Sequence, residues 1–502
     1  MAMAATVPAV RAAAQQLAGD PLRAAAAALG VPGLDTLEVK ASGSDYLFGQ
    51  AYDGQSAWPR FDVPLYSLWI DYRVPALREE RTRAQGQNPP LGGGNQPIRD
   101  QHQLWWVSGA TAWNGDGASA SAAGRERDQR PSDLARRTQI WMTPHGFIKG
   151  ALAAGSAASV RSAERNGRSI TSVRYTTVDG VPLDGTLDEA GLVERIETWV
   201  GTPVLGDVPL EVIFSRYDPF GPIRFPRRIV QKEAGYPVLA LDVAAVTANA
   251  PGRIDVPAAV TAGRSAAPPA TPQRLAEGVW SIPLGPRDRS VAIELADAVI
   301  VVEAPDSEEM SLRALAALRT VVPGKPVTHV INTHIHFDHS GGLRTYAAEG
   351  ATIVTHPDNI AYYARVWADG PRRLSADRLS RTGRQPRFEG VVGSRTFGDG
   401  ARRAVVYHYA GNLHHPGMLM VYLPAERLLI EADSFNPPAT PGQEPNAVPN
   451  LVQFHEAVQR LALDVEQVVP LHGRVTTWDE LLTAVDTYGH PRSRPSSDRS
   501  TR

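Results

Sequence analysis

Apolar and polar residues alternate with a period of two in short runs between about residues 35 and 255. This alternation is typical of strands with one buried face, and the clearest run lies at 66–74. Further strand candidates, most of them bounded by Gly, Pro or Asp, lie at 104–107, 139–142, 169–177, 192–200, 210–217, 228–232 and 238–243. Many short strands separated by turn residues predict a curved, mainly antiparallel sheet.

The pattern changes after residues 256–273, a stretch rich in Pro, Ala, Thr and Ser that predicts a linker. Beyond it, strand candidates alternate with amphipathic helices. The strand candidates are 278–284, 290–295, 298–303, 327–332, 352–355, 403–409, 419–423 and 467–471, and the helices are 307–321, 358–367, 450–461 and one starting at 343. The chain is therefore expected to be α+β, with helices covering sheets in its second half.

These patterns predict five segments along the chain. Residues 1–34 form an Ala-rich helical segment, 35–255 a β-rich domain and 256–273 the linker. Residues 274–490 form a second domain, and 491–502, rich in Ser, Arg and Pro, a disordered tail. The β-rich domain contains a group of tryptophans and tyrosines that either fill its core or line a groove for a substrate or a hydrophobic ligand.

Composition excludes several classes of function. The net charge of the 502 residues is −2, without the basic stripe that nucleic-acid binding needs. No apolar run reaches the length of a transmembrane helix. The chain has no cysteine, so disulfides, thiolate metal ligands and a cysteine nucleophile are excluded. The expected partner is a small-molecule substrate. A periplasmic or secreted location and a cytoplasmic one both remain open, since no signal peptide is visible in this numbering.

Eleven of the 13 histidines lie after residue 300. One short segment, 333–342, follows a β-branched run and contains three imidazoles and a carboxylate within six residues: His334, His336, Asp338 and His339. A loop at the end of a buried strand holds such side chains around one point. Imidazole nitrogens and carboxylate oxygens are ligands for cations such as Zn²⁺, so the segment predicts a metal site.

The pattern H-x-H-x-D-H followed by Gly-Gly resembles the metallo-β-lactamase-fold superfamily of metallohydrolases. The resemblance covers residues 274–490 and implies an αβ/βα sandwich with further ligands in a fixed order. His414 before Pro-Gly, Asp433 after a strand and His472 after another strand fill those places. The implied first metal site has His334, His336 and His414, and the second has Asp338, His339 and His472, with Asp433 bridging both. The sequence departs from the common pattern at Glu431-Ala432, where Thr-Gly is usual, and at Leu471.

The resemblance implies a dinuclear zinc hydrolase that uses a metal-bound hydroxide to cleave an ester, lactone, amide or lactam. Two Zn²⁺ ions per chain are expected, with Fe or Mn as other candidates, and Asp338 is the candidate proton acceptor. The alternative is a non-haem iron oxidoreductase of the sulfur-oxidising type on the same fold. Because such enzymes dispense with several ligands of the second site, the presence of His339 and His472 argues against them.

Two residues beside these ligands leave alternatives open. His415 adjoins His414 and either contacts substrate or faces solvent in the turn. Arg474 follows His472 by two residues and is a candidate for binding a substrate carboxylate. The substrate itself, the native metal and the oligomeric state lie beyond what the sequence indicates.

Overall fold

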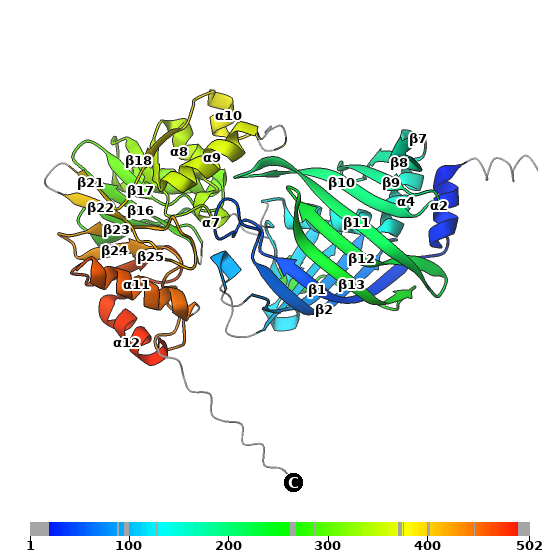
Figure 1. Cartoon of the computed structure of the whole chain (residues 1–502), viewed down its shortest axis with the longest axis horizontal. Helices are drawn as coiled ribbons and strands as arrows, with labels where there is room; N and C mark the ends of the chain where they lie inside the picture. The colour runs from blue at the N-terminus through cyan, green and yellow to red at the C-terminus, as the bar shows by residue number, and fades with distance from the viewer. Residues whose placement is uncertain are drawn as a thin grey trace, which may run out of the picture. The chain divides into compact units, whose positions relative to one another are not determined.

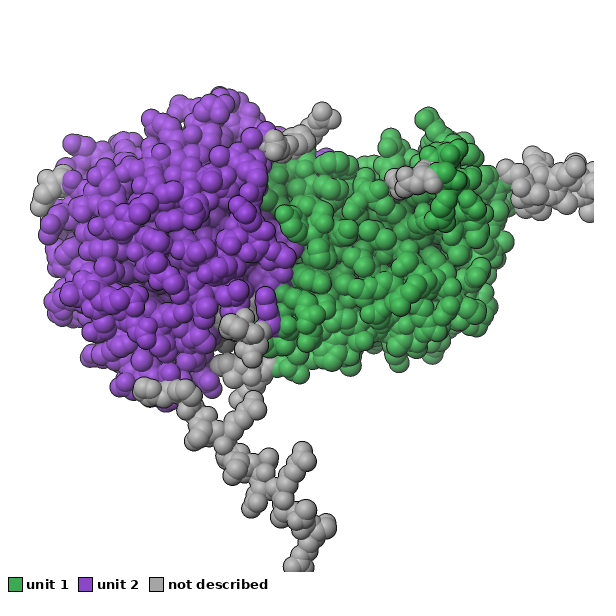
Figure 2. Space-filling model, in the orientation of Figure 1, with its two compact units in different colours: residues 1–48, 60–86, 99–266 green, residues 49–59, 87–98, 267–502 purple. Residues whose placement is uncertain are grey.

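A computed structural model of the chain describes residues 20–87, 90–94, 100–126, 129–165, 167–261, 268–285, 287–369, 374, 376–398, 402–445 and 447–489. The predicted tail at 491–502 and most of the predicted N-terminal helical segment lie outside these residues. The chain divides into two compact units, coloured in Figure 2. Unit 1 comprises residues 1–48, 60–86 and 99–266, and unit 2 comprises residues 49–59, 87–98 and 267–502.

Two stretches from the first half of the chain therefore belong to unit 2. The predicted β-rich domain comprises residues 35–255 without interruption, whereas residues 49–59 and 87–98 cluster with the C-terminal half. Backbone hydrogen bonds fix both stretches there. The N–H of Phe337 donates to the carbonyl of Gly49 at 3.2 Å, and the N–H of Gly92 donates to the carbonyl of Leu413 at 3.0 Å. Hydrogen bonds between residues so distant in sequence leave no local pattern in either partner.

Unit 1 is built on a 13-stranded antiparallel sheet, which confirms the predicted β-rich, mainly antiparallel architecture (Figure 1). Its order is β6-β5-β4-β3-β2-β1-β13-β12-β11-β10-β9-β8-β7, so the first and last strands pair at its centre. The strands are β1 Thr36–Tyr46, β2 Arg60–Asp71, β3 Ala76–Gln85, β4 Gln101–Ser108, β5 Thr111–Asn114, β6 Ser121–Ala122, β7 Ser159–Arg165, β8 Arg168–Thr176, β9 Pro182–Leu187, β10 Val193–Thr202, β11 Gly206–Phe220, β12 Ile223–Glu233 and β13 Tyr236–Ala248. The predicted hairpin between β12 and β13 turns at Ala234-Gly235, where both φ angles are positive.

The helices of unit 1 are α2 Pro21–Leu29, α3 Ser132–Trp141, α4 Pro144–Ala154 and α5 Ala258–Thr261. The prediction of a strand at 139–142 was wrong, because these residues end α3. Arg136 on α3 donates to the carbonyls of Trp106 and Trp113 at 2.9 and 2.8 Å, which anchors the helix on β4 and β5. A run of four residues does not distinguish a helix from a strand, and this tertiary anchoring decided between them.

His145 of α4 makes the stability of unit 1 depend on pH. The side chain is fully buried, and its Nε2 lies 3.0 Å from the carbonyl oxygen of Leu29. Burial, together with the charge of Lys149, lowers the pKa of His145 to about 4. The unfolded chain, with an ordinary histidine pKa near 6.5, therefore binds more protons than the folded chain between about pH 4 and 6.5.

We expect the free energy of unfolding to decrease by up to about 3 kcal/mol as the pH falls from about 6.5 to 4, because of His145. Above about pH 6.5 the stability that it contributes is fully present. The measurement is urea denaturation of the wild type and of His145→Gln across this range. The difference in unfolding free energy between the two proteins should change with pH, and a pH-independent difference would contradict the assignment.

Unit 2 has two sheets. The seven-stranded sheet contains β14 Gln273–Ala276, β15 Val279–Pro283, β16 Arg289–Glu294, β17 Val299–Val302, β18 Val327–Ile331, β19 Thr352–Thr355 and β20 Arg387–Gly390, in that order. The six-stranded sheet contains β21 Ser394–Gly398, β22 Arg403–His408, β23 Leu419–Leu423, β24 Leu428–Glu431, β25 Gln467–Pro470 and β26 Thr476–Thr477. One buried apolar cluster takes side chains such as Ile300 and Ile331 from the first sheet and Val421 and Val469 from the second, so the sheets pack face to face.

Helices cover these sheets, as the predicted αβ/βα sandwich requires (Figure 1). They are α6 Glu308–Val321, α7 Phe337–Ser340, α8 Leu343–Glu349, α9 Pro357–Asp369, α10 Arg378–Thr382, α11 Val448–Arg460 and α12 Trp478–Tyr488. Leu451 and Phe454 of α11 and Leu481 of α12 form a second apolar cluster with residues of the six-stranded sheet. In the part of the chain that the structure describes, no helix is long and apolar enough to cross a membrane.

The strand order of unit 2 brings distant loops to one edge. β17, β18 and β19 are parallel neighbours, so the residues that follow them emerge on the same side. β24 and β25 are also parallel, which places Asp433 and His472 just beyond adjacent strand ends. His414 lies in the connection between the antiparallel strands β22 and β23.

Candidate metal centre

Asn332 holds the histidine-rich loop that follows β18. Its buried side-chain amide donates to Glu303 Oε1 at 3.2 Å and to the carbonyls of His334 and His339 at 2.7 and 3.2 Å. The hydroxyl of Tyr363 donates to the other end of the amide, Asn332 Oδ1, at 2.7 Å. Hydrogen bonds at both ends of the Asn332 amide hold it in place. The amide in turn fixes the loop, so the imidazoles have defined positions.

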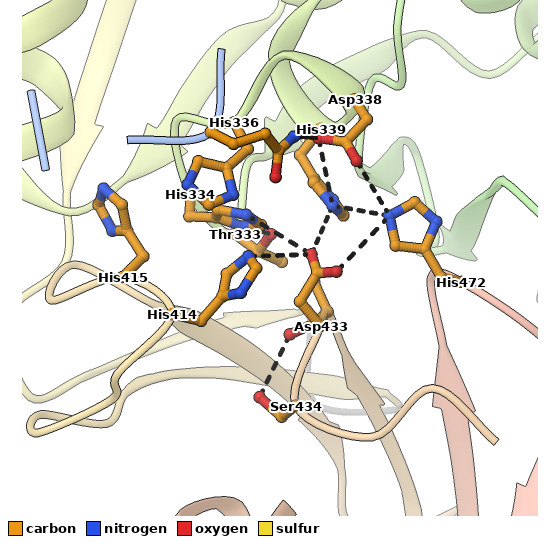
Figure 3. Close-up of polar contacts among 12 residues, drawn as sticks. Thr333, His334, His336, Asp338, His339, His414, His415, Asp433, Ser434 and His472 are labelled. Carbon is orange, nitrogen blue, oxygen red and sulfur yellow. Dashed lines mark hydrogen bonds and ion pairs between the residues drawn. The ribbon is translucent and has the colours of Figure 1, made fainter. Parts of the chain in front are cut away.

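Three of the imidazoles converge at one point, as Figure 3 shows. His334, His336 and His414 are buried, and each offers one ring nitrogen to a group whose atoms lie within 4.8 Å of one another. Among the described residues, His334 Nε2, His336 Nδ1 and His414 Nε2 have no hydrogen-bond partner. Buried polar atoms without partners are rare in folded proteins. Three of them aimed at one point form a set of donors that fits a cation.

The hydrogen bonds of the opposite ring nitrogens set the tautomers. Thr333 Oγ1 donates to Glu303 Oε2 at 2.6 Å, so it accepts from the Nδ1–H of His334 at 2.9 Å. His336 donates its Nε2–H to the carbonyl of Ala51 at 2.8 Å. Both arrangements leave the converging nitrogens with free lone pairs, which is the form that binds a metal.

Asp338, His339 and His472 form a second group, with ligand atoms again within 4.8 Å of one another. His339 donates its Nδ1–H to Glu303 Oε2 at 2.9 Å, and the carboxylate of Asp288 lies 3.0 Å from His472 Nδ1. Both Nε2 atoms are then lone-pair donors, and they lie 2.9 Å apart. Two facing acceptors repel each other unless a proton or a metal ion lies between them, so the second group also fits a metal.

Asp433 connects the two groups (Figure 3). Its Oδ2 lies 2.6 Å from His339 Nε2 and 3.6 Å from the Nε2 atoms of both His334 and His414. Asp433 has a positive φ of 56°, a backbone conformation that is strained for a residue with a side chain. Asn450 Nδ2 donates to its carbonyl at 3.3 Å, which helps to hold that conformation.

The charges of the site follow from burial and from the carboxylates. Burial lowers the pKa of His336 to about 3 and also lowers the pKa values of His334 and His414, so these rings are neutral. At the second group, Asp433 and Asp288 overcome the effect of burial and raise the pKa of His472 to about 10. The imidazoles of His339, His414 and His472 outweigh burial and lower the pKa of Asp433. A bound cation would take the place of the protons that these carboxylates otherwise attract.

The segment at 49–59 contributes two contacts that sequence reasoning missed. Gln50 Nε2 donates to Asp338 Oδ1 at 2.6 Å, and the carbonyl of Ala51 accepts from His336. Gly49 has φ +79°, and a Cβ there would lie 2.5 Å from Cγ of Phe337, so only glycine fits. No sequence signal identified these residues, because they precede their partners by more than 280 positions.

Glu303 was also missed, although it had a signal. It ends the strand candidate 298–303, and it accepts from Thr333, His339 and Asn332 while being 1% exposed. Since strand ends gather at the edge where the histidines lie, a carboxylate at the end of such a strand was a candidate for a hydrogen bond to one of them.

The structure narrows the alternatives that the sequence left open for two residues. His415 does not face solvent: it is buried, and its Nδ1 accepts from the N–H of Gly417 at 3.0 Å. Arg474 is ion-paired with Glu480 and donates to the carbonyl of Pro438 at 2.9 Å. Its guanidinium is therefore already engaged, which removes the reason to assign it a substrate carboxylate.

Comparison with known proteins bears on unit 2. Residues 290–474 match the model of the metallo-beta-lactamase superfamily. A segment of 197 residues is 32% identical to the 2,4-dinitroanisole O-demethylase subunit alpha of Nocardioides sp. (strain JS1661), covering 39% of this chain. The chain thus spans about half of that relative, 55% of its length.

Solved structures match less than half of the chain. A metallo-beta-lactamase from Pontibacter korlensis is 17% identical, with 43% of this chain and 99% of that one covered and a TM-score of 0.34. The FIM-1 metallo-beta-lactamase from Pseudomonas aeruginosa is 15% identical, with 44% and 97% covered and a TM-score of 0.34. The sec-alkylsulfatase Pisa1 from Pseudomonas sp. is 14% identical, with 44% and 42% covered and a TM-score of 0.33.

Proposed function

We propose, from the premise that residues 290–474 form a metallo-beta-lactamase superfamily domain, that this enzyme is a dinuclear zinc hydrolase. Its substrates would be esters, lactones, amides or lactams. The observation that carries the proposal is the pair of ligand groups that Asp433 connects, with the unpartnered ring nitrogens of His334, His336 and His414 converging at the first group. The proposed ligands are His334, His336 and His414 at one metal, Asp338, His339 and His472 at the other, and Asp433 at both.

Zinc suits this donor set, which consists of imidazole nitrogens and carboxylate oxygens without thiolates. When bound, Zn²⁺ lowers the pKa of a coordinated water from about 15.7 to about 7 and polarises a carbonyl oxygen. The chain itself must then hold the ligands in place and accept a proton.

Asp338 is the residue we propose for proton transfer. Its side chain is 31% exposed, so it is open to water, unlike the neighbouring imidazoles. Gln50 holds Oδ1 at 2.6 Å, and Oδ2 lies 3.5 Å from His472 Nε2. Gln50 thus acts as a positioning residue, since it restricts the rotation of the carboxylate that would receive the proton.

Replacing Gln50 tests this positioning. In Gln50→Leu we expect kcat/KM to fall about tenfold or more and the second metal to bind more weakly, because outer-shell partners typically contribute 10- to 100-fold. Chelator competition measures metal affinity independently of activity. Gln55→Leu is the matched control, because Gln55 lies in the same segment with its side chain exposed. Equal metal affinity and activity in Gln50→Leu and the control would contradict the role.

The curated relative favours one further reaction on the same centre. Its name describes O-demethylation of 2,4-dinitroanisole, an aryl methyl ether. Water can cleave such an ether into a phenol and methanol without any oxidant. The oxygen of the attacking water then belongs to one of the two products, the phenol or the methanol. We therefore include electron-poor aryl methyl ethers beside the carbonyl substrates.

The test of the proposed function is a substrate screen with purified protein loaded with zinc, iron or manganese. Esters, lactones, thioesters, amides, β-lactams, phosphodiesters and 2,4-dinitroanisole should be offered, while oxygen uptake is recorded. Zinc-dependent hydrolysis without oxygen uptake is the expected result. Iron as the native metal, with oxygen consumed and no hydrolysis, would instead favour an oxidoreductase.

A further inference from the structure

Unit 1 contains a cavity of about 430 Å³ that takes no part in the metal centre. Its lining comes from β1 to β4 on one side and β11 to β13 on the other, with α3 and the α3–α4 turn. In a flat sheet β4 and β11 would lie about 29 Å apart, at roughly 4.8 Å per strand. The sheet therefore curves around the cavity, whose volume is in the range of small-molecule sites.

One flank of the cavity is mainly apolar, although Gln231 and Glu233 of β12 also line it. Strand register places its residues in adjacent positions: Leu241 pairs with Ile229, and Ile229 pairs with Phe214. The other apolar lining residues of β11 to β13 are Leu210, Val212, Phe225, Val238 and Leu239. This flank can hold an alkyl chain or an aromatic ring away from water.

The opposite flank is charged, but its charges are paired. Arg81 and Arg83 lie 3.3 and 2.7 Å from the carboxylate of Asp45, and Arg136 lies 3.0 Å from Glu126. The guanidinium of Arg81 also stacks on Trp105, 4.3 Å from its ring centre. Glu79 of this flank accepts from Gln139 at 2.6 Å. The ionic groups of the lining number four acids and four arginines, so the cavity has no net charge.

Among the described residues that line the cavity, one buried acceptor atom is left for a ligand. In the described part of the chain, Gln103 Oε1 is buried and accepts no hydrogen bond. Gln103 lines the cavity on β4, next to the charged flank. A buried acceptor of this kind is stabilised by a donor that a ligand would bring.

We propose that unit 1 binds a neutral amphiphile, with an alkyl or aryl body against β11 to β13 and a hydroxyl or primary amide donating to Gln103. A charged head group is disfavoured, because Arg81, Arg83 and Arg136 are already ion-paired with the carboxylates of the same flank. An added charge in this setting would stay unpaired, away from water. This inference is independent of the proposed hydrolase, since it uses no residue of unit 2.

The test is fluorescence titration of the full chain with N-phenyl-1-naphthylamine, a neutral apolar probe with one N–H. We expect saturable binding with a Kd on the order of micromolar. Displacement should follow the head group, with 1-decanol and decanamide at least about tenfold more effective than decanoate or decylammonium. No saturable binding, or equal displacement by decanol and decanoate, would overturn the proposal.

Filling the cavity locates the bound probe. Val212→Trp should weaken probe binding at least about tenfold, whereas Ile213→Trp, on the opposite face of β11, should leave it unchanged. A thermal melt shows whether Val212→Trp folds. If it does not, Leu241→Phe fills the cavity with a smaller change. Decanol can donate a hydrogen bond to Gln103, whereas its methyl ether cannot, so the wild type should bind decanol more tightly. Gln103→Leu should abolish this preference while retaining probe binding. Unchanged probe affinity in both folded filling variants would place the probe elsewhere and contradict the assignment.

Discussion

The variant His336→Ala, purified with excess zinc, should retain at most about one metal ion per chain and lose about 1000-fold in kcat/KM, on the order of 4 kcal/mol. His336 supplies one of three unpartnered nitrogens at the first group, and its own Nε2 is fixed by the carbonyl of Ala51. Removing the ring leaves two imidazoles, which is fewer than the three protein ligands of catalytic zinc sites.

Elemental analysis of the dialysed protein measures the metal, and hydrolysis of the best substrate of the screen measures the rate. His455→Ala is the control, because it removes a half-buried imidazole of α11 that packs near Trp478. The control should keep both metals and full activity. A His336→Ala protein with two tightly bound metals and wild-type hydrolysis would remove the basis of the proposed function.

The variant Glu303→Gln should lose 10- to 100-fold in affinity for the second metal, while the first metal is affected less. Glu303 accepts the Nδ1–H of His339 and also holds Thr333, which in turn fixes the tautomer of His334. The amide has one acceptor oxygen in place of two, so at least one buried donor of this network loses its partner. We expect a further destabilisation of about 1–3 kcal/mol from that unmade hydrogen bond.

Competition with a chromophoric chelator separates the two metal affinities, and urea denaturation measures the stability. Glu456→Gln is the matched control, because the side chain of Glu456 is 59% exposed and lies on α11. The control should behave as the wild type in both measurements. If Glu303→Gln bound both metals with wild-type affinity, the orientation of His339 would not depend on Glu303.

The candidate ligands were accessible from sequence because each lies beside a local pattern. His334, Asp433 and His472 lie two or three residues beyond the ends of strands, and His414 lies just before a Pro-Gly turn. The structure brings all seven predicted residues into overlapping groups within 4.8 Å. Sheet topology explains why, since parallel neighbours such as β24 and β25 end at the same edge.

The contacts around the ligands were less accessible. The carbonyl of Ala51 holds His336, yet every residue has a carbonyl, so no residue type could reveal that role. Gln50 and Gly49 lie in a region whose local pattern is that of the β-rich unit, although they belong to the metal-binding one. The helix at 132–141 was likewise decided by the carbonyls of Trp106 and Trp113, not by its own apolar run.

The sequence by itself determined the candidate metal ligands and the two classes of architecture, because residue type and hydrophobic period are local properties of the chain. Only the tertiary structure decided which segments complete the metal centre, which charges pair, and that the sheet of unit 1 encloses a cavity. These depend on contacts between residues hundreds of positions apart, and the free energy of such contacts leaves no periodic trace in either segment.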